Sequence, residues 1–218
     1  MAQILRFYDE QHTYTLDGEN IPSVSELTRF LSREIYGDIS QYRLDHAAER
    51  GSIIHKACEN LDRFGDCEIS EEYAPYIRAY MQFRTDYTPQ YIAIEKPFAS
   101  PSLRFAGTPD RIARMSDGRK AIIDLKSSSV VQKTLASAQL NGYRILCDEN
   151  TPDLPITHLY ILHLRPDASY KLISFPLYSW RAIPCIQPFR RSPEFPRKKR
   201  KPRNERNRNN VSRPLRSP

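Results

Sequence analysis

Two aspartates and a lysine in the middle of the sequence have types and spacing that suit divalent-metal chemistry. Asp110 follows a proline, and Asp124 and Lys126 belong to a short apolar segment. Because side chains alternate along a strand, Asp124 and Lys126 project from one face and Leu125 points to the other. Mg²⁺ and Mn²⁺ prefer carboxylate oxygens. A neighbouring lysine can orient or help to deprotonate a metal-bound water and can offset charge on a pentavalent phosphate.

A structural ion pair is the alternative interpretation of this pattern. Asp124 and Lys126 are flanked by Ile122, Ile123 and Leu125. Charged groups inside a strand are costly to bury unless they are paired. An aspartate and a lysine two positions apart are therefore compatible with a salt bridge as well as with a metal site, and these residues alone leave both interpretations open.

The N-terminal segment predicts a β-ribbon followed by a short helix. Residues 5–23 are rich in β-branched and aromatic side chains and contain an Asp-Gly pair, which suits a hairpin turn because glycine tolerates positive φ. Ser23 and Glu26 have the S-x-x-E spacing of a capping box, in which hydroxyl and carboxylate satisfy free amides at a helix start. We expect a helix from there to about Leu31.

Two amphipathic helices are expected next. Small and apolar residues recur at three- and four-residue spacing over 44–64, which predicts a helix with one packing face. Over 71–87, five aromatic residues from Tyr73 to Tyr87 keep to one face of a second helix. We interpret these aromatic side chains as core, and a stacking platform for nucleic-acid bases is the alternative.

The rest of the body predicts a mixed sheet. The expected strands are 91–98, 103–108, 120–126, 156–164 and 170–177. A turn over 116–119 joins the second and third strands and brings Asp110 back beside Asp124. Helical spacing returns over 131–147. The fold class is therefore mixed α/β, with helices that precede and interrupt the sheet.

Two further motifs stand on the predicted helices. A G-x-x-x-H pattern ends at His55, and a Q-x-x-x-Y pattern joins Gln139 to Tyr143. With Asp110 and the Asp-x-Lys pair, these motifs follow the order helix-His, strand-Asp, strand-Asp-x-Lys, helix-Gln-x-x-x-Tyr over roughly 45–145. This arrangement resembles the PD-(D/E)xK nuclease superfamily, and within it the RecB-like exonuclease branch.

The resemblance implies a restriction-endonuclease-like core, with a central mixed sheet flanked by helices, and phosphodiester hydrolysis that depends on Mg²⁺ or Mn²⁺. Asp110, Asp124 and Lys126 would form the catalytic set. His55, Asp110, Asp124 and the carbonyl of Leu125 would hold the metal, and Lys126 would serve the attacking water.

Four other side chains are candidates for the same site. Gln139 and Tyr143 share a helix face and would contact DNA, although ordinary polar decoration of a helix explains them as well. Glu59, one turn after His55, would accept the second N–H of the imidazole. Glu95 is a candidate for a further carboxylate ligand, although the lysine beside it suggests a residue at the rim.

Weaker signals come from other reactive side chains. Arg111 and Lys133 could contact phosphates, although exposed cations are usually solvated. The four cysteines are scattered and form no CxxC pair. We therefore expect no structural zinc site, disulfide framework or iron–sulfur cluster.

The distribution of charge divides the chain at Trp180. The 218 residues carry 33 Lys+Arg and 26 Asp+Glu, a formal charge of +7. Residues 1–180 hold 20 basic and 24 acidic side chains, a net of −4, and 181–218 hold 13 and 2, a net of +11. We expect a nuclease domain over 1–180, with hairpin and helices in 1–90 and a catalytic core in 91–180. Residues 181–218 are expected to form a disordered Arg/Pro-rich basic tail.

The tail departs from the resemblance, because a further helix packing on the sheet would be expected there. A nucleic-acid-binding arm, a partner-binding segment and a changed reading frame are three explanations that one sequence leaves open. The net charge of +7 does not by itself indicate that residues 1–180 bind nucleic acid, because basic residues indicate such a partner only where they share a surface.

The expected function is a DNA exonuclease in phage DNA processing, recombination or repair, with a single-strand annealing or recombination protein as a further partner. No stretch approaches the roughly 18 uninterrupted apolar residues of a membrane span, and no signal-peptide run opens the sequence, so we expect a cytoplasmic protein without membrane contacts. The alternative is a catalytically inactive protein that keeps the nuclease-like fold and binds nucleic acid through its basic tail.

Overall fold

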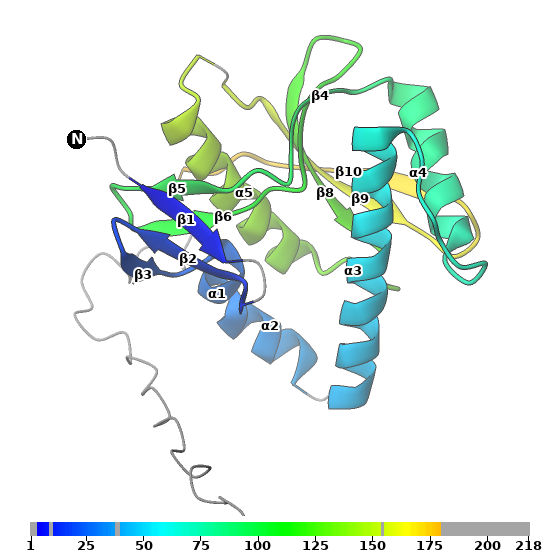
Figure 1. Ribbon diagram of the computed structural model, residues 1–218, viewed down its shortest axis with the longest axis horizontal. Helices are drawn as coiled ribbons and strands as arrows, with labels where there is room; N and C mark the ends of the chain where they lie inside the picture. The colour runs from blue at the N-terminus through cyan, green and yellow to red at the C-terminus, as the bar shows by residue number, and fades with distance from the viewer. Residues whose placement is uncertain (1–3, 9–10, 38–39, 154, 180–218) are drawn as a thin grey trace, which may run out of the picture.

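The computed structural model describes residues 4–8, 11–37, 40–153 and 155–179. The predicted boundary at 180 and the predicted tail over 181–218 lie outside these ranges. Within the described ranges the chain forms a small N-terminal sheet, a central sheet and a two-stranded sheet, with helices around them (Figure 1). No helix of the described part is both long and apolar enough to cross a membrane.

The N-terminal sheet confirms the predicted ribbon. It is antiparallel, with strand order β1-β2-β3, and it turns at Asp17 and Gly18, whose φ angles of 52° and 84° lie in the left-handed region. Buried side chains of this sheet pack against Ala99 and Ala106 of the two-stranded sheet. The strands are β1 (Leu5–Tyr8), β2 (Thr13–Leu16) and β3 (Glu19–Ile21).

The capping box forms as predicted. The Glu26 N–H donates to Ser23 Oγ and the Ser23 N–H donates to a Glu26 carboxylate oxygen, both at 3.0 Å. The helices that follow are α1 (Val24–Leu27), α2 (Arg29–Tyr36), α3 (Gln41–Phe64) and α4 (Ala74–Tyr87). The two long helices, α3 and α4, correspond to the amphipathic helices expected over 44–64 and 71–87.

The central sheet has the order β10-β9-β8-β7-β4 and is mixed, because β8 and β9 are parallel and the other neighbours are antiparallel. A parallel pair needs a crossover, and helix α5 (Lys133–Asn150) provides it. The strands are β4 (Gln90–Ile94), β7 (Arg111–Arg114), β8 (Lys120–Lys126), β9 (His158–Leu164) and β10 (Tyr170–Phe175).

Two of the predicted strands are wrong in extent or in place. The strand predicted over 91–98 breaks, because Glu95 takes a φ of 46° and Pro97 has no N–H to donate. Its last residue, Phe98, begins a separate strand, β5 (Phe98–Ser100), which pairs with β6 (Phe105–Gly107) outside the central sheet. The strand beside β8 is therefore β7 and not 103–108, and Asp110 stands immediately before it.

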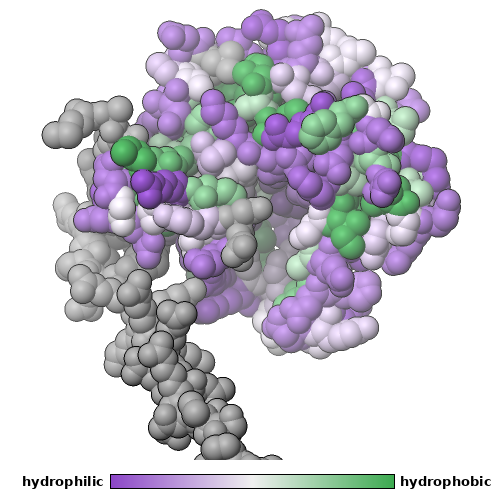
Figure 2. Space-filling view, in the orientation of Figure 1, coloured by the Kyte–Doolittle hydropathy of each residue, from purple (hydrophilic) through white to green (hydrophobic). Residues whose placement is uncertain are grey.

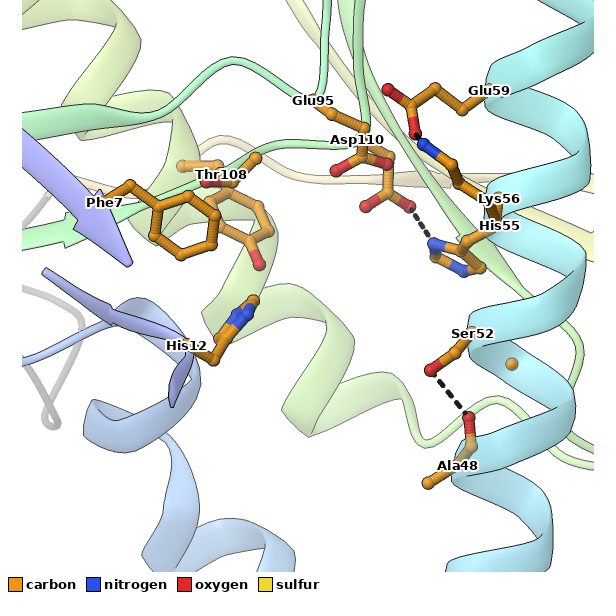
Figure 3. A pocket seen from close by; sticks show the side chains of 12 residues that line it. Phe7, His12, Ala48, Ser52, His55, Lys56, Glu59, Glu95, Thr108 and Asp110 are labelled. Atoms are coloured by element: carbon orange, nitrogen blue, oxygen red, sulfur yellow. Dashed lines mark hydrogen bonds and ion pairs between the residues drawn. The ribbon is translucent and has the colours of Figure 1, made fainter. Parts of the chain in front are cut away.

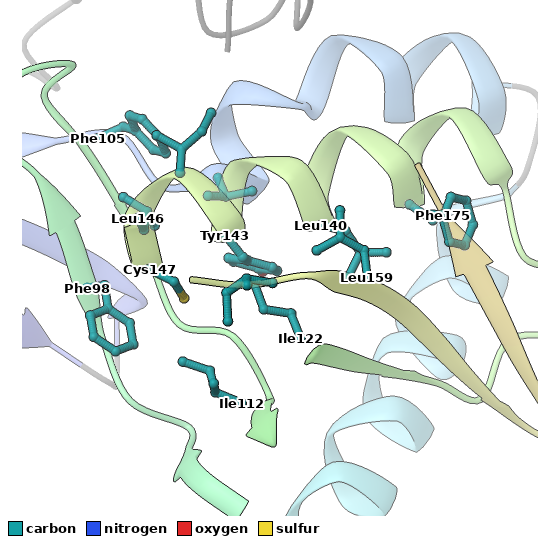
Figure 4. Close-up of a cluster of buried hydrophobic side chains, with 14 of the residues drawn as sticks. Phe98, Phe105, Ile112, Ile122, Leu140, Tyr143, Leu146, Cys147, Leu159 and Phe175 are labelled. Atoms are coloured by element: carbon teal, nitrogen blue, oxygen red, sulfur yellow. The ribbon is translucent and has the colours of Figure 1, made fainter. Parts of the chain in front are cut away.

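Two apolar cores lie on opposite faces of the central sheet. Ile122 belongs to the core under α5, which Figure 4 shows, whereas Ile123 and Leu125 belong to the core under α3 and α4. Tyr80 and Phe83 of α4 are fully buried in this second core. The core interpretation of the aromatic stripe is therefore confirmed.

Candidate active site

A cavity of about 690 Å³ opens between the N-terminal sheet and helix α3. The same face is visibly hollowed between these two elements in Figure 2. Phe7 and His12 line one wall, Ser52 and His55 line the other, and Asp110 lies between the walls (Figure 3). The site thus draws on segments from the N-terminus to α5, across the predicted division at residue 90.

Asp110 joins two elements at the end of this cavity. Its Oδ2 accepts the Leu125 N–H at 2.7 Å and lies 3.4 Å from His55 Nδ1. The other ring nitrogen of His55, Nε2, lies 3.0 Å from the Leu125 carbonyl oxygen. Strand β8 and helix α3 therefore hold three of the predicted ligand groups in mutual contact, although their positions in the sequence are far apart.

Asp124 and Lys126 form an ion pair on the next part of β8. Lys126 Nζ lies 2.6 Å from Asp124 Oδ2, and Asp124 is 2% exposed. Burial raises the pKa of Asp124, against the opposing effect of Lys126. Burial acts to lower the pKa of Lys126, yet that pKa is raised by Asp124 and Asp110. The lysine therefore stays charged, and the ion pair anticipated as the alternative is present beside the other site residues.

Glu95 lies inside the site and not at its rim. Ligand atoms of His55, Glu95 and Asp110 lie within 4.8 Å of one another; we call these three residues the metal cluster. The left-handed φ of Glu95 turns the chain out of β4, and its N–H donates to the Asp110 carbonyl at 3.0 Å. Burial, followed by the charge of Asp110, raises the pKa of Glu95 to about 8. Strand alternation ends at Glu95, so the position of its neighbour Lys96 does not predict that Glu95 lies at the rim.

The donor set fits a divalent cation. One imidazole, two carboxylates and the nearby Leu125 carbonyl are mostly oxygen donors, which suit Mg²⁺ and Mn²⁺. The pKa of Glu95 is raised first by burial and then by the charge of Asp110, so a cation at this position would favour the ionised carboxylate. Asp124 lies outside the three-residue cluster in this arrangement, because Lys126 holds its carboxylate.

The role expected for Glu59 is wrong. Its carboxylate accepts from Lys56 Nζ at 2.9 Å and from Arg63 Nε at 2.7 Å. Both ring nitrogens of His55 face other groups, namely Asp110 and the Leu125 carbonyl. Although burial acts to raise the pKa of Glu59, hydrogen bonds from Lys56 and Arg63 lower it. Glu59 is therefore a member of an ion-pair row on α3 at the edge of the cavity.

Arg111 is buried and is not the exposed phosphate contact that was considered. It is 1% exposed, and its Nε donates to Asp62 Oδ2 at 2.7 Å. Its Nη1 donates to the Asp110 carbonyl at 2.7 Å and to Glu95 Oε1 at 3.3 Å. Tyr80 also donates to Asp62 Oδ2, at 2.5 Å. We call Asp62, Arg111 and Tyr80 the arginine network.

Asp62 is the residue that the sequence analysis missed. An arginine inside an apolar strand requires a buried carboxylate, so the signal was Arg111 itself. Asp62 lies 49 positions away on α3. Helices α3 and α4 contain several other acidic residues that the sequence alone does not distinguish from Asp62. Only the packing of α3 on the sheet selects Asp62.

Tyr143 and Gln139 of α5 line two different pockets. Tyr143 lines the large cavity, and burial, with the charges of Asp124 and Asp110, raises its pKa well above the ordinary value, so the phenol stays protonated. Gln139 lines a small pocket of about 30 Å³ together with Lys126. A Cβ on Gly107 would lie 3.0 Å from Tyr143 Cε1, so this glycine leaves room for the ring.

Comparison with known protein families identifies the class of this protein. The sequence model of the PD-(D/E)XK nuclease superfamily matches residues 65–207, a span that includes Asp110, Asp124 and Lys126 and begins after His55. The chain belongs to the PD-(D/E)XK nuclease superfamily, and it is a nuclease by family. The central mixed sheet with flanking helices is the restriction-endonuclease-like fold that the motifs predicted.

One solved structure with similarity to this chain is the crystal structure of an alkaline exonuclease from Laribacter hongkongensis. The alignment covers 64% of this chain and 72% of that chain, with 14% identity and a TM-score of 0.36. At these values the similarity carries no argument about function. A search of curated proteins gave no match.

Proposed function

We propose that this protein is a Mg²⁺- or Mn²⁺-dependent deoxyribonuclease. The observation that carries the proposal is the convergence of His55, Glu95 and Asp110 within 4.8 Å, beside the Lys126–Asp124 pair at 2.6 Å. Oxygen-rich ligands for a divalent cation face the large cavity, and the charged Lys126 lines a small pocket together with Gln139. Metal ligands and a positively charged side chain are the groups that metal-dependent hydrolysis of a phosphodiester uses.

His55, Glu95, Asp110 and the Leu125 carbonyl would hold the cation, and Asp124 would join them when its carboxylate leaves Lys126. A bound Mg²⁺ or Mn²⁺ would lower the pKa of a coordinated water and offset the charge that develops on the phosphate. A carboxylate-rich site repels a polyanionic substrate unless such a cation lies between them.

The protein side chains would then orient the reacting groups. Lys126 would donate a hydrogen bond to the attacking water, which places the oxygen in line with the leaving oxygen of the scissile bond. Attack would form a new P–O bond with the water oxygen and break the bond to the leaving oxygen. The attacking water would lose a proton to solvent, and the leaving oxygen would take up a proton from solvent. Tyr143, kept protonated by its surroundings, would donate to a phosphate oxygen. Gln139 would contact DNA on the Lys126 side.

Exonucleolytic action in phage DNA processing, recombination or repair is the finer part of the proposal. It is supported by the order of the G-x-x-x-H, Asp-x-Lys and Q-x-x-x-Y motifs, which resembles the RecB-like branch. A single-strand annealing or recombination protein is proposed as a partner on the same basis. The basic segment over 181–218 is proposed as a DNA-binding or partner-binding tail.

A cleavage assay on matched DNA substrates tests the proposal. Linear duplex, circular duplex and single-stranded DNA are each incubated with Mg²⁺, with Mn²⁺ or with EDTA. We expect metal-dependent degradation of linear DNA, sparing of closed circles, and loss of activity in Asp110→Ala and Lys126→Ala. Glu59→Gln, which alters the same helix face outside the metal cluster, is the matched control.

The assay also tests the alternative of an inactive nucleic-acid-binding protein. Retained activity in both Asp110→Ala and Lys126→Ala would overturn the assignment of the site. Absence of cleavage, together with salt-sensitive DNA binding that disappears when 181–218 are removed, would favour the inactive protein.

A further inference from the structure

The wall of the cavity that faces the metal cluster is aromatic. Phe7 of β1 and His12, just before β2, both project into the cavity, opposite His55 and Ser52 of α3 (Figure 3). The two rings meet edge to face, with centroids 5.3 Å apart and an interplanar angle of 87°. Phe7 also stacks on Tyr14 at 4.7 Å. We call Phe7 and His12 the aromatic wall.

The aromatic wall is anchored to the connection between β6 and β7, which carries Asp110. Tyr14, on which Phe7 stacks, is 2% exposed, and its hydroxyl lies 2.8 Å from Thr108 Oγ1. Thr108 lines the same cavity, two residues before Asp110. The wall is thereby tied to the segment that carries Asp110 by a partly buried hydrogen bond and a ring stack.

His12 stands in the turn before β2 with an unusual backbone conformation. His12 has a φ of 46°, in the left-handed region that residues other than glycine seldom adopt. Such conformations persist where the surroundings impose them, and they gather at functional sites. The residue is exposed, so burial of its ring in the core does not account for its position.

Charge separates the two sides of the cavity. The carboxylates of the metal cluster lie at one side with Lys56 on the rim, and these groups, with a cation, suit a phosphate. The aromatic wall offers flat rings, which suit the face of a base. A nucleotide has both features, an anionic phosphate joined to a flat base, and a cavity of about 690 Å³ is of the size that holds ligands of this class.

We propose that the aromatic wall stacks on an unpaired base next to the scissile phosphate, so that the substrate presents a single-stranded segment in the site. This inference rests on the proposed nuclease function. In a duplex the faces of internal bases are covered by their neighbours, so side chains that receive a face select an unpaired or terminal nucleotide. The wall therefore contributes to substrate choice, while the metal cluster contributes to chemistry.

Fluorescence of 2-aminopurine tests the contact directly, because stacking quenches this base. A single-stranded oligonucleotide with terminal 2-aminopurine is titrated in Mg²⁺ with Lys126→Ala protein, and with the same protein that also carries Phe7→Leu and His12→Gln. Leucine keeps apolar volume against Tyr14, and circular dichroism checks the fold. We expect quenching by the first protein, and weaker quenching with about 5- to 150-fold lower affinity for the second.

Tyr8→Leu is the matched control. Tyr8 neighbours Phe7 on β1, is 44% exposed, and points to the other face of the strand. It is expected to leave quenching unchanged. In proteins with Lys126 intact, Phe7→Leu with His12→Gln is expected to raise KM for single-stranded ends more than for blunt duplex, with kcat little changed.

The outcomes separate this inference from the proposed function. Unchanged quenching and unchanged KM in the Phe7→Leu, His12→Gln protein would overturn the inference while leaving metal-dependent cleavage standing, and this is also the result expected if the wall serves a protein partner. Absence of cleavage by the native protein, with quenching that depends on Phe7 and His12, would overturn the nuclease proposal and leave the base-binding site.

Discussion

Asp110 and Arg111 are neighbours in the chain, yet they enter two polar clusters of opposite character. Asp110 belongs to the metal cluster, which faces a cavity of about 690 Å³. Arg111 belongs to the arginine network, where its guanidinium and the carboxylate of Asp62 are 1% and 0% exposed. The start of β7 therefore places Asp110 in a cluster that is open to the cavity and Arg111 in a network that is closed to solvent.

The difference lies in the balance of charge. In the arginine network a cation and a carboxylate lie 2.7 Å apart and compensate each other. In the metal cluster two carboxylates share one imidazole and a longer contact of 3.3 Å from Arg111 to Glu95. Burial beside Asp110 still raises the pKa of Glu95 to about 8. Buried charge that is balanced supports the fold, whereas buried negative charge in excess, open to a cavity, is available to a cation.

The largest expected effect is the loss of catalysis without loss of fold in Asp110→Asn. Asparagine keeps an oxygen for the Leu125 N–H but removes a negative charge from the metal cluster. We expect activity to fall by about 10²- to 10⁴-fold, the range for loss of a group that acts on the reacting atoms. Unfolding in urea should need at least as much denaturant as the native protein. Lower stability with full activity would place Asp110 on the structural side of the comparison.

Arg111→Met is expected to have the opposite profile. It leaves the Asp62 carboxylate buried without its main cation, which costs about 3–5 kcal/mol when one partner of a buried pair is removed. Urea denaturation measures this loss. The double variant Asp62→Leu, Arg111→Met should recover much of it, because apolar replacement of both partners is often neutral. If Arg111→Met alone were as stable as the native protein, the arginine network would not stabilise the fold as a buried ion pair.

The pH dependence of stability should come from the open cluster. The folded pKa of Glu95, about 8, lies above its ordinary value of 4.5. The folded state therefore binds more protons than the unfolded state between these values, and stability falls as pH rises from about 5 to about 8. Thermal melting of metal-free protein in EDTA checks the slope. Glu95→Gln should flatten it, and a slope that persists in this variant would assign it to another group.

His55→Gln tests whether His55 belongs to the metal cluster. The imidazole lies 3.4 Å from Asp110 and 3.0 Å from the Leu125 carbonyl, so its loss should weaken Mn²⁺ binding by at least about tenfold, the lower bound for loss of even an outer-shell partner. Isothermal titration measures the affinity. Glu59→Gln, outside the metal cluster on the same helix, is the comparison variant, and equal affinity in His55→Gln and native protein would remove His55 from the cluster.

The smallest effect is expected for Glu59→Gln, which weakens ion pairs with Lys56 and Arg63 on α3. The two cations are 66% and 41% exposed, and exposed pairs contribute less than about 1 kcal/mol. Activity should stay within about twofold of native in the cleavage assay. A large loss of activity with unchanged stability would bring Glu59 into the metal cluster after all.

Local rules were enough for the elements that are set by neighbours in the chain. The capping box at Ser23 and Glu26 and the one-sided spacing of α3 and α4 predicted helices that the structure contains. Strand alternation predicted that Leu125 turns away from Asp124 and Lys126, and Leu125 is 1% exposed in the core under α3. The roles assigned to the site residues stay predictions.

The sequence by itself determined the capped start of α1, the long helices α3, α4 and α5, the strand β8 and the order of the motifs, because spacing and capping act over a few residues. The helix expected to about Leu31 ends instead at Leu27, and a separate helix α2 follows it. Only the tertiary structure decided that Glu95 enters the metal cluster, that Asp62 pairs with Arg111, and that the aromatic wall faces Asp110. These relations join residues 15 to 103 positions apart. They depend on a left-handed turn at Glu95 and on how α3 and the N-terminal sheet pack against the central sheet, and no local spacing records such contacts.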